Sequence, residues 1–407
     1  MLVNADFHVH SCFSMASSKD MLIKNMAPKS KLKGLQLLGT GDAFHPGWLD
    51  IIEESTSYLG DGIYNADGMD FVLTTEVEGK NKIHHLIIIP DIDIARELSD
   101  ILPSNNKNSD GRPKTKYGGV ELLELVREYD CLIGPAHAFT PWTGMYKSYD
   151  SIYECYEKKV DFVELGLSAD TFMADTVSEL KDFPFLTNSD AHSPWPHRLG
   201  REFNVMELKD ISFSSIKHAI KHRDIKANYG LVPNLGKYHM TACTKCFKLV
   251  DPVSAKENKM KCSCGGRIKK GVDFRISEIA DYEKPIHPDF RPEYIHLMPL
   301  AELIATIYDK GVTTKTVQKI WQKLIDNFGD EITVLIKASL EEINKIDKDV
   351  ALTIKAFRNN DIEIKPGGGG QYGKILFEKT VKENSTNNIT LDNFKIKRTW
   401  RDLNPRS

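Results

Sequence analysis

Long hydrophobic runs are missing from this 407-residue sequence. The longest lies near Leu86–Ile89, far short of the roughly 20 residues that cross a bilayer, so we expect no membrane segment. The start carries an acid and histidines instead of a basic and then apolar stretch, so we expect no signal peptide. The sequence also has no strong excess of basic or acidic residues. The net charge is −3, and a polyanion would have to bind to a local patch.

Cysteine is scarce, and its count of seven is odd. Four cysteines lie within Cys243–Cys264 and three are scattered, which argues against a disulfide framework. We therefore expect a reducing, cytoplasmic setting. Hydrophobic residues make up 41% and charged residues 27% of the chain, as is ordinary for a globular protein with a packed core.

Three shifts in composition suggest three units. Ten of the thirteen histidines lie before residue 223, the clustered cysteines lie between 243 and 264, and the pattern becomes helical after about residue 290. The expected domains are residues 1–232, 233–275 and 276–407.

Seven short apolar runs alternate with helix-like stretches in the first unit. They are Leu2–Phe7, Leu35–Leu38, Phe71–Leu73, Leu86–Ile89, Cys131–Ile133, Phe162–Leu165 and Phe183–Leu186. This alternation predicts an α/β fold with a mostly parallel sheet, and seven runs favour a β/α barrel over an open sheet. The polar segment 104–118 is predicted to be a surface loop.

Side chains that bind metal ions stand where these runs begin or end. They are Asp6, His8, His10, Asp42, Glu76, Glu78, His84, His85, His137, Asp190 and His192. In a β/α barrel the strand ends face a common mouth, so these groups would converge there. The set is too large for one ion and predicts two or three, of zinc, manganese or magnesium. We prefer Glu76 to Glu78 because it lies nearer its strand, and His85 to His84 because it begins its apolar run.

These motifs, in their order and spacing, resemble those of the PHP (polymerase and histidinol phosphatase) metallo-phosphoesterases over roughly residues 1–230. The resemblance implies a distorted (β/α)7 barrel that holds up to three metals. The implied active-site ligands are His8, His10, Asp42, Glu76, His85, His137, Asp190 and His192. The chain has Met15 where many members have an acid, and Gly41-Asp42 where many have Asp-His. Two ions are therefore better supported than three.

The four clustered cysteines, Cys243, Cys246, Cys262 and Cys264, predict a zinc-ribbon module. Two close thiolate pairs supply a closed tetrahedral set, which suits one structural zinc and leaves no open position for catalysis. From Lys237 to Arg275 there are ten basic and three acidic residues, a local net charge of +7. This surface is the best candidate for contacts with phosphates.

The last unit carries apolar residues at helical spacing over 300–308, 316–328 and 340–357. Gly368–Lys374 then matches GxxxxGK, but Ile375 follows where a P-loop needs Ser or Thr, so we expect no nucleotide site. A glycine-rich turn that lets the backbone approach another surface, such as DNA, fits better. Gln371–Phe377 lacks the hydrophobic spacing of a sliding-clamp motif.

The whole arrangement resembles the endonuclease Q family, in the segments Gly39–Asp42, Thr74–Glu78, Asp190–Gly200 and Gly367–Gly373. The resemblance implies a DNA-repair enzyme associated with the nucleoid. Such an enzyme nicks DNA on the 5′ side of deaminated bases (uracil, hypoxanthine, xanthine) or abasic sites, by means of a metal-bridged hydroxide.

Roles follow for particular residues. His10, Asp190 and His192 are the expected catalytic residues, with Asp190 or His192 relaying a proton. His197 and Arg198 are candidates to hold a phosphate. A pocket for an extruded base would draw on aromatics near the motif loops: Phe44, Trp48, Phe139, Trp142 and Trp195. Two alternatives stay open: a small-molecule phosphatase of the histidinol-phosphate type, and a non-catalytic zinc-dependent DNA-binding protein.

Overall fold

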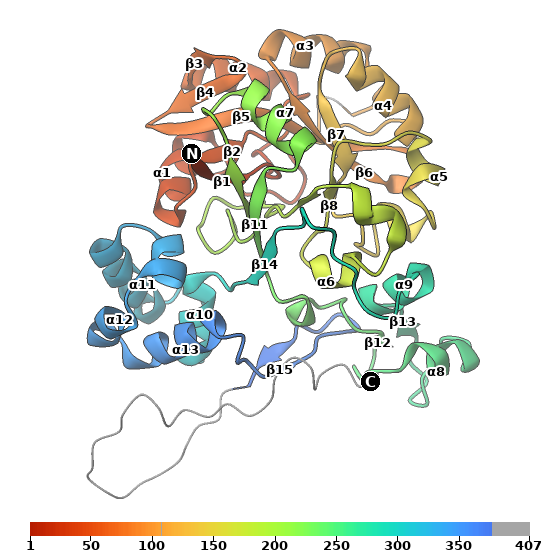
Figure 1. Ribbon diagram of the computed structural model, residues 1–407, viewed down its shortest axis with the longest axis vertical. Coiled ribbons are helices and arrows are strands. Elements are labelled where there is room, and N and C mark those ends of the chain that lie inside the picture. Colours follow the sequence, from red (N-terminus) through yellow and green to blue (C-terminus); the bar gives the residue numbers. More distant parts are fainter. Residues whose placement is uncertain (107, 377–407) are drawn as a thin grey trace, which may run out of the picture.

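The first apolar run forms β1 (Leu2–Asp6), an inner strand of the main sheet (Figure 1). On one side β1 pairs in parallel with β2 (Leu37–Gly39), and β2 pairs in parallel with β5 (Met69–Glu78). On the other side β1 pairs antiparallel with β10 (Phe203–Glu207), and β10 with β11 (Ile225–Gly230). β1 and β2 therefore end at the same edge of the sheet.

The computed structural model describes residues 1–106 and 108–376. The final part of the expected third domain, residues 377–407, lies outside the described residues. Within the described part, no helix is both long and apolar enough to span a membrane.

The sheet becomes antiparallel beyond β5. β6 (His84–Ile89) runs against β5, and β7 (Leu132–Pro135) runs against β6. The last two runs form a separate parallel pair, β8 (Val163–Glu164) and β9 (Phe185–Leu186). All seven runs form strands, but the prediction of a mostly parallel sheet is wrong. Only residues 79–83 join β5 to β6, too few for the crossover that a parallel pair requires.

Alternate side chains of these strands build one buried apolar cluster. Its members include Val3, Ala5, Phe7, Leu37, Val72, Leu86, Leu132, Phe162 and Leu186. Because alternate residues of a strand point to one side, the strands face a common interior. Single backbone contacts link segments next to strands that share no ladder: Asp161 N, just before β8, donates to Ile133 O of β7, and Val9, after β1, bridges Ala191, after β9.

Helices lie outside these strands (Figure 1). The longer ones are α1 (Ile23–Lys33), α2 (Pro46–Ser55), α3 (Ile92–Ile101), α4 (Gly119–Arg127) and α7 (Phe213–His222). α4 shows how the pattern works: Leu122, Leu123 and Val126 lie on one face and are buried, as the 3.6-residue period predicts. The hairpin of β3 (Ser57–Gly60) and β4 (Ile63–Ala66) extends the sheet beside β5.

The four-cysteine module is small. It contains β12 (Ala242–Cys243), α8 (Pro252–Glu257) and β13 (Ile268–Lys269), and α9 (Val272–Ile279) follows it. The chain then returns to the main sheet, where β14 (Glu293–His296) pairs in parallel with β11. The third unit is therefore not wholly helical, since its first segment supplies a strand to the sheet of the first unit.

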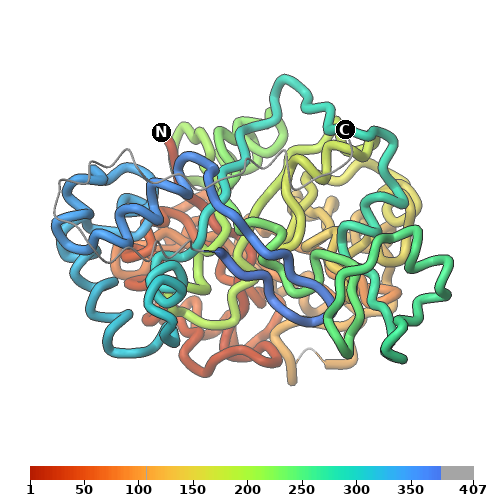
Figure 2. The backbone as a smooth tube through the Cα atoms, turned by 90° about the horizontal axis from the view of Figure 1, so that it is seen from below, coloured from red at the N-terminus to blue at the C-terminus, as the bar shows by residue number. Residues whose placement is uncertain are grey.

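The C-terminal helices match their sequence pattern. They are α10 (Leu300–Ile307), α11 (Lys315–Phe328), α12 (Leu340–Ile346) and α13 (Lys348–Arg358). The predicted helix 340–357 is two helices, because Asp347 takes an extended conformation (φ −158°) between them. In a view from below, this helical unit and the cysteine module lie on opposite sides of the molecule (Figure 2).

The glycine-rich turn joins β15 (Ile364–Lys365) to β16 (Lys374–Ile375) and packs on the cysteine module. Met240 N donates to Gly367 O, and Gly369 has a φ of +63°. A β-carbon at Gly369 would lie 2.6 Å from Cys243 O, so only glycine fits. The backbone does approach another surface, as expected, but that surface is the protein's own module.

Candidate active site

The fold brings the ends of β1, β5 and β7 and the start of β6 to one place. His8 and His10 follow β1, Glu76 lies near the end of β5, and His137 follows β7. His84 is the first residue of β6 and pairs with Glu78. Because β6 is reversed, its first residues lie at the same edge as the last residues of β5. This reversal explains why a strand start contributes to a site made of strand ends.

Glu76 is the centre of the cluster. Its Oε1 lies 2.6 Å from His84 Nδ1, 2.9 Å from His137 Nε2 and 3.5 Å from His8 Nε2. Its Oε2 lies 2.8 Å from Arg112 Nη1 and 3.5 Å from His10 Nε2. Burial alone would raise the pKa of Glu76, but His84 and His137 outweigh it and lower the pKa well below its ordinary value. Glu76 is therefore an anion around which cationic ligands gather.

Asp190 and His192 form the exposed side of the cluster. Asp190 Oδ1 lies 3.2 Å from His10 Nε2 and 3.5 Å from His192 Nε2. About a third of each of the Asp190 and His192 side chains is exposed, whereas those of His8 and His10 are fully buried. A substrate therefore reaches Asp190 and His192 first.

The backbone is strained at the two residues that turn the chain into the cluster. His137 has a φ of +32° and Asp190 one of +47°. Non-glycine residues rarely adopt positive φ values, and they concentrate at functional sites.

Five buried imidazole nitrogens have no hydrogen-bond partner among the described residues. Four lie in the cluster (His8 Nε2, His10 Nε2, His84 Nε2 and His137 Nδ1), and the fifth is His85 Nε2. Burial opposes protonation of His8, but the Glu164 and Glu76 carboxylates outweigh it and raise the pKa of His8 to about 9. Positive charge is thus favoured on the His8 ring, whose Nε2 lies 3.5 Å from Glu76 Oε1 but makes no hydrogen bond. Divalent metal ions satisfy both conditions, and imidazole and carboxylate are their usual ligands.

Three overlapping groups of side chains have the spacing of metal ligands. They are His8, His10 and Glu76; His10, Asp190 and His192; and Glu76, His84 and His137. The groups share His10 and Glu76, as expected where neighbouring ions share ligands. The residues present therefore fit more than one metal ion.

Asp42 and Glu164 contact the Nδ1 atoms of His10 and His8, on the side of each ring that faces away from the centre of the cluster. Asp42 Oδ1 lies 3.1 Å from His10 Nδ1, and Glu164 Oε2 lies 2.9 Å from His8 Nδ1. Such outer partners set the tautomer and orientation of a ligating imidazole. Asp42 was expected to be a ligand itself, but the structure turns its carboxylate to His10 Nδ1, Ser11 and Ser14, away from the three groups.

The structure does not bring the expected ligand His85 into the cluster. Its Nδ1 lies 2.6 Å from Tyr156 Oη. Its Nε2 lies so close to Gly79 that a β-carbon on Gly79 would be only 2.7 Å away, so the ring packs against the backbone there. Adjacent residues of a strand face opposite sides, so only one of the pair can enter the site. That residue is His84. Glu76 lies at the centre of the cluster, whereas among the described histidines the Glu78 carboxylate contacts His84 alone, at 3.5 Å.

Sequence reasoning missed Glu164 and Arg112. Glu164 ends the apolar run Phe162–Leu165, so the strand-end rule could have found it. Arg112 lies in segment 104–118, which has the composition of a surface loop. Its pairing with Glu76 is long-range, and no local signal marks it.

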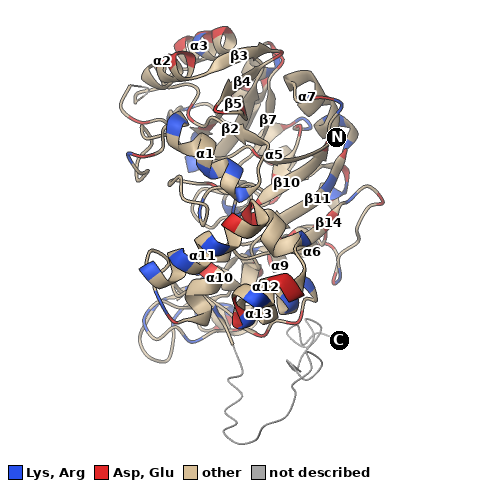
Figure 3. Cartoon of the chain, turned by 90° about the vertical axis from the view of Figure 1, so that its left-hand side faces the viewer, with Lys and Arg blue, Asp and Glu red and all other residues tan. Residues whose placement is uncertain are grey.

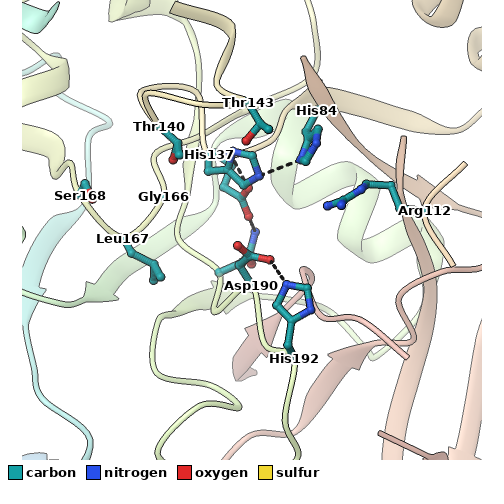
Figure 4. Close-up of a pocket in the computed structure, with 12 residues that line it drawn as sticks. His84, Arg112, His137, Thr140, Thr143, Gly166, Leu167, Ser168, Asp190 and His192 are labelled. Atoms are coloured by element: carbon teal, nitrogen blue, oxygen red, sulfur yellow. Dashed lines mark hydrogen bonds and ion pairs between the residues drawn. The ribbon is translucent and has the colours of Figure 1, made fainter. Parts of the chain in front are cut away.

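A cavity of about 350 Å³ opens beside the cluster (Figure 4). Its lining includes His84, Arg112, His137, Thr140, Thr143, Glu164, Gly166, Leu167, Ser168, Asn188, Asp190 and His192. Leu167 and Ser168 lie on one side of the view and Arg112 on the other. The cavity thus joins a charged wall to a more neutral one, next to the groups that could bind metal.

Comparisons with known proteins identify the family. A family model described as the MJ0043 C-terminal domain matches residues 299–361. The uncharacterized protein MJ0043 of Methanocaldococcus jannaschii is 55% identical over 287 residues, which cover 68% of this chain and 36% of that protein. This chain therefore spans only about a third of that longer relative. The uncharacterized protein YqxK of Bacillus subtilis is 34% identical over 404 residues, 92% of this chain and 99% of that protein.

Two solved structures are similar over almost the whole chain. The lesion-specific endonuclease PfuEndoQ from Pyrococcus furiosus is 46% identical with a TM-score of 0.90, covering 94% of this chain and 98% of that one. An endonuclease Q in complex with a 27-mer duplex substrate, with an abasic lesion at the active site, is 44% identical with a TM-score of 0.89, covering 99% and 100%. The chain belongs to the endonuclease Q family.

In this endonuclease Q chain, the two candidates for phosphate contacts lie away from the cavity lining. Arg198 Nη1 lies 3.1 Å from Glu302 Oε1 of α10, so it ties the site loop to the helical unit. Burial, followed by the charge of Arg198, lowers the pKa of His197 to about 4. A neutral His197 is a weak partner for a phosphate.

The aromatic candidates for a base pocket divide into two sets. Phe44, Trp48 and Phe139 are buried in the core, where no base can stack on them. Trp142 and Trp195 are about half exposed. Lys269 lies over the Trp142 ring at 3.4 Å, and Lys29 over the Trp195 ring at 5.0 Å.

The cysteine module of the endonuclease Q chain is arranged for a metal. The Sγ atoms of Cys243, Cys246, Cys262 and Cys264 lie within 4.8 Å of one another. Cys243 and Cys264 are 3.6 Å apart, and Cys246 and Cys262 are 3.7 Å apart. A tetrahedral zinc with Zn–S bonds of about 2.3 Å needs S···S distances of about 3.8 Å. The four thiols therefore fit one zinc ion.

Proposed function

We propose that this chain is a metal-dependent endonuclease that nicks DNA on the 5′ side of damaged positions, either deaminated bases or abasic sites. The observation that carries the proposal is the 44% identity, over 99% of the chain, to an endonuclease Q whose active site holds an abasic lesion in duplex DNA. The buried imidazole nitrogens of the cluster that make no hydrogen bond give independent chemical support for bound metal ions.

Seven side chains would hold two or three divalent ions: His8, His10, Glu76, His84, His137, Asp190 and His192. When bound, these ions would supply Lewis-acid activation and neutralise the charge on the scissile phosphate. Imidazole suits zinc and carboxylate suits manganese and magnesium, so this mixture, in which imidazoles outnumber carboxylates, favours zinc among the three candidates. Glu164 and Asp42 would keep His8 and His10 oriented toward the ions.

Asp190 and His192, on the exposed side of the cluster, are the residues that would transfer protons. Asp190 and His192 are partly open to the cavity, and Ser17 Oγ lies 2.8 Å from His192 Nδ1. Ser17 thereby orients the ring so that its Nε2 faces Asp190. The Nε2 of His192 would serve either as a ligand of an ion or as the acid that gives a proton to the leaving oxygen, but not both at once. The Arg112 guanidinium can contact a phosphate oxygen from the opposite wall.

A nucleotide turned out of the duplex would enter the neutral part of the cavity. Ser168 and Thr140 offer hydroxyl groups there, and Leu167 offers an apolar contact. Hydrogen bonds to the edge of the base can separate a carbonyl from an amine. An abasic site leaves this part of the cavity empty, which is consistent with cleavage of both kinds of lesion.

The first 232 residues act as a distorted (β/α)7 barrel in this proposal. The common apolar interior of the strands and the contact of Val9 with Ala191 support a nearly closed arrangement. Residues 233–275 act as a zinc module, and residues from 276 onward as a mainly helical unit that contributes to DNA contact. A DNA-repair role places the enzyme in the cytoplasm with the nucleoid.

The test is a nicking assay with added divalent metal. Duplex oligonucleotides carry uracil, hypoxanthine, an abasic site or no lesion, and products are sized to locate the cut. We expect nicks on the 5′ side of each lesion and none in the undamaged duplex. Hydrolysis of p-nitrophenyl phosphate without any nicking would instead establish a small-molecule phosphatase. Lesion binding without either activity would establish a non-catalytic protein.

A further inference from the structure

The outward face of α11 carries a row of lysines. Lys315, Lys319 and Lys323 are all exposed and follow one another at about 6 Å, four residues of helix rise. None of them makes an ion pair with any residue in 1–106 or 108–376. The first turn of α11 contains no acid, although an acid there would favour the helix dipole. Helix stability does not explain this row.

The same face of the molecule continues onto α1. Figure 3 shows Lys and Arg on both α1 and α11 on the side that faces the viewer. Lys29 of α1 lies over the Trp195 ring, and 47% of Trp195 is exposed. Arg198 of the loop after β9 forms an ion pair with Glu302 of α10. The charge of Glu302 is therefore already balanced and does not neutralise the lysines.

This surface reaches the candidate active site. Trp195 lies three residues after His192, in the same loop. Ser18 N donates to His192 O, and the exposed Lys19 follows. A chain of phosphates on this surface would therefore lead directly to Asp190 and His192.

A buried ion pair fixes the two helices as one unit. Lys33 Nζ of α1 lies 2.6 Å from Glu331 Oε1 and donates to Pro196 O at 3.0 Å. Glu331 also accepts from Leu300 N and Trp321 Nε1. Both charged side chains are almost fully buried. The relative position of α1, α11 and the site loop is thus set before any ligand binds.

We propose that this surface, the α1–α11 basic face (Lys19, Lys29, Trp195, Lys315, Lys319 and Lys323), binds the duplex DNA that flanks the nicked position. The inference rests on the proposed function and names the part of the substrate that this face holds. α11 is about 21 Å long, more than half a turn of B-DNA. The lysines contact phosphates, and such contacts carry no sequence information. This suits an enzyme that must act on damage in any sequence.

The test compares two triple variants in the full chain without added metal. One replaces the lysines of α11 (Lys315→Gln, Lys319→Gln, Lys323→Gln). The control replaces Lys209, Lys221 and Lys226 by Gln. Glu207, two residues before Lys209, lies opposite Leu2 in the β1–β10 ladder, and Lys226 forms an ion pair with Glu207. Lys209 and Lys226 are therefore near the start of β1, at the other end of this strand from His8 and His10, and Lys221 is in the last turn of α7. Circular dichroism melting confirms that both variants are folded.

Binding of a 30-base-pair duplex with one abasic site is measured by fluorescence anisotropy at several salt concentrations. The α11 variant should bind at least 10-fold more weakly near 0.1 M salt, and its slope of log K against log salt should fall by about 2.7, or 0.9 for each lost phosphate contact. The control should match the wild type. An unchanged slope in the α11 variant, or an equal loss in the control, overturns the proposal.

Shortened duplexes locate the contact. Removing the flank on the side held by α11 should weaken the wild type but not the α11 variant, and removing the other flank should weaken both equally. Equal losses in both proteins for both flanks would overturn the proposal. Because binding is measured without metal, a protein that binds in this way yet nicks nothing would contradict the proposed function and leave the basic face supported.

Discussion

The two candidate metal centres of this molecule are built in opposite ways. The four cysteines lie within 22 residues of sequence and come from short local turns. The histidine–carboxylate cluster gathers residues from His8 to His192, across most of the first unit. The cysteine centre is a closed set of four equal ligands, two of them exposed. The other centre is buried, shares ligands between groups and opens onto a cavity through Asp190 and His192.

The closed cysteine set is typical of a structural metal site, whereas the histidine–carboxylate cluster beside a cavity is typical of a reactive one. Four thiolates fill a tetrahedral zinc and leave no position for substrate. The second centre has several partly filled groups of ligands and outer carboxylates that orient them. Changes in the first centre should affect zinc content and local folding, whereas changes in the second should affect cleavage.

The largest effect is expected for His10→Ala. His10 belongs to two of the three ligand groups, so its loss disturbs both. Nicking should fall by about 1,000-fold or more, equivalent to about 4 kcal/mol of barrier. Affinity for an abasic duplex should stay within about threefold in the same anisotropy assay. Unchanged cleavage by His10→Ala would remove this site from consideration.

A large contrast is expected between His84→Gln and His85→Gln, which are adjacent on β6. Only His84 contacts Glu76 and His137, so His84→Gln should slow nicking by about 100-fold, or ~2.7 kcal/mol. His85→Gln loses the contact with Tyr156, and should cost about 1–3 kcal/mol of stability. Turnover and thermal melting are measured for both. A greater loss of activity at His85 would show that β6 presents the other face to the metals.

A smaller effect is expected for Glu164→Gln. The amide keeps the shape but cannot balance charge on His8, which Glu164 contacts at 2.9 Å. Loss of such an outer carboxylate costs about 10- to 100-fold in metal affinity or activity. Activity is titrated against added metal. Recovery at high metal concentration is the expected result, and wild-type metal dependence would show that Glu164 does not act through the ligands.

The smallest effect on cleavage is expected for Cys246→Ser. The variant should lose one equivalent of zinc by metal analysis, and limited proteolysis should cut within residues 243–264 faster than in the wild type. At saturating DNA, turnover should stay within about threefold, because a closed four-thiolate zinc has no open position. A loss as large as that of His10→Ala would contradict the division between a structural and a reactive centre.

The amino-acid sequence alone determined the seven strands predicted from apolar runs, the helical character of the C-terminal unit and the cysteine module. Each depends on residues close in sequence, through alternating apolar positions, helical spacing and paired cysteines. The strand-end histidines were also found this way, because polar residues directly after an apolar run mark the mouth of such a sheet.

Only the tertiary structure decided how these pieces meet. The reversal of β6 places His84, and not His85, against Glu76, and Asp42 contacts His10 Nδ1, outside the three groups of candidate ligands. Arg112 reaches Glu76 from a polar loop, and the glycine-rich turn packs on the cysteine module. These outcomes depend on strand direction and on contacts between residues far apart in the chain. Local sequence patterns record which residues are apolar or polar, but not which distant residue each will face.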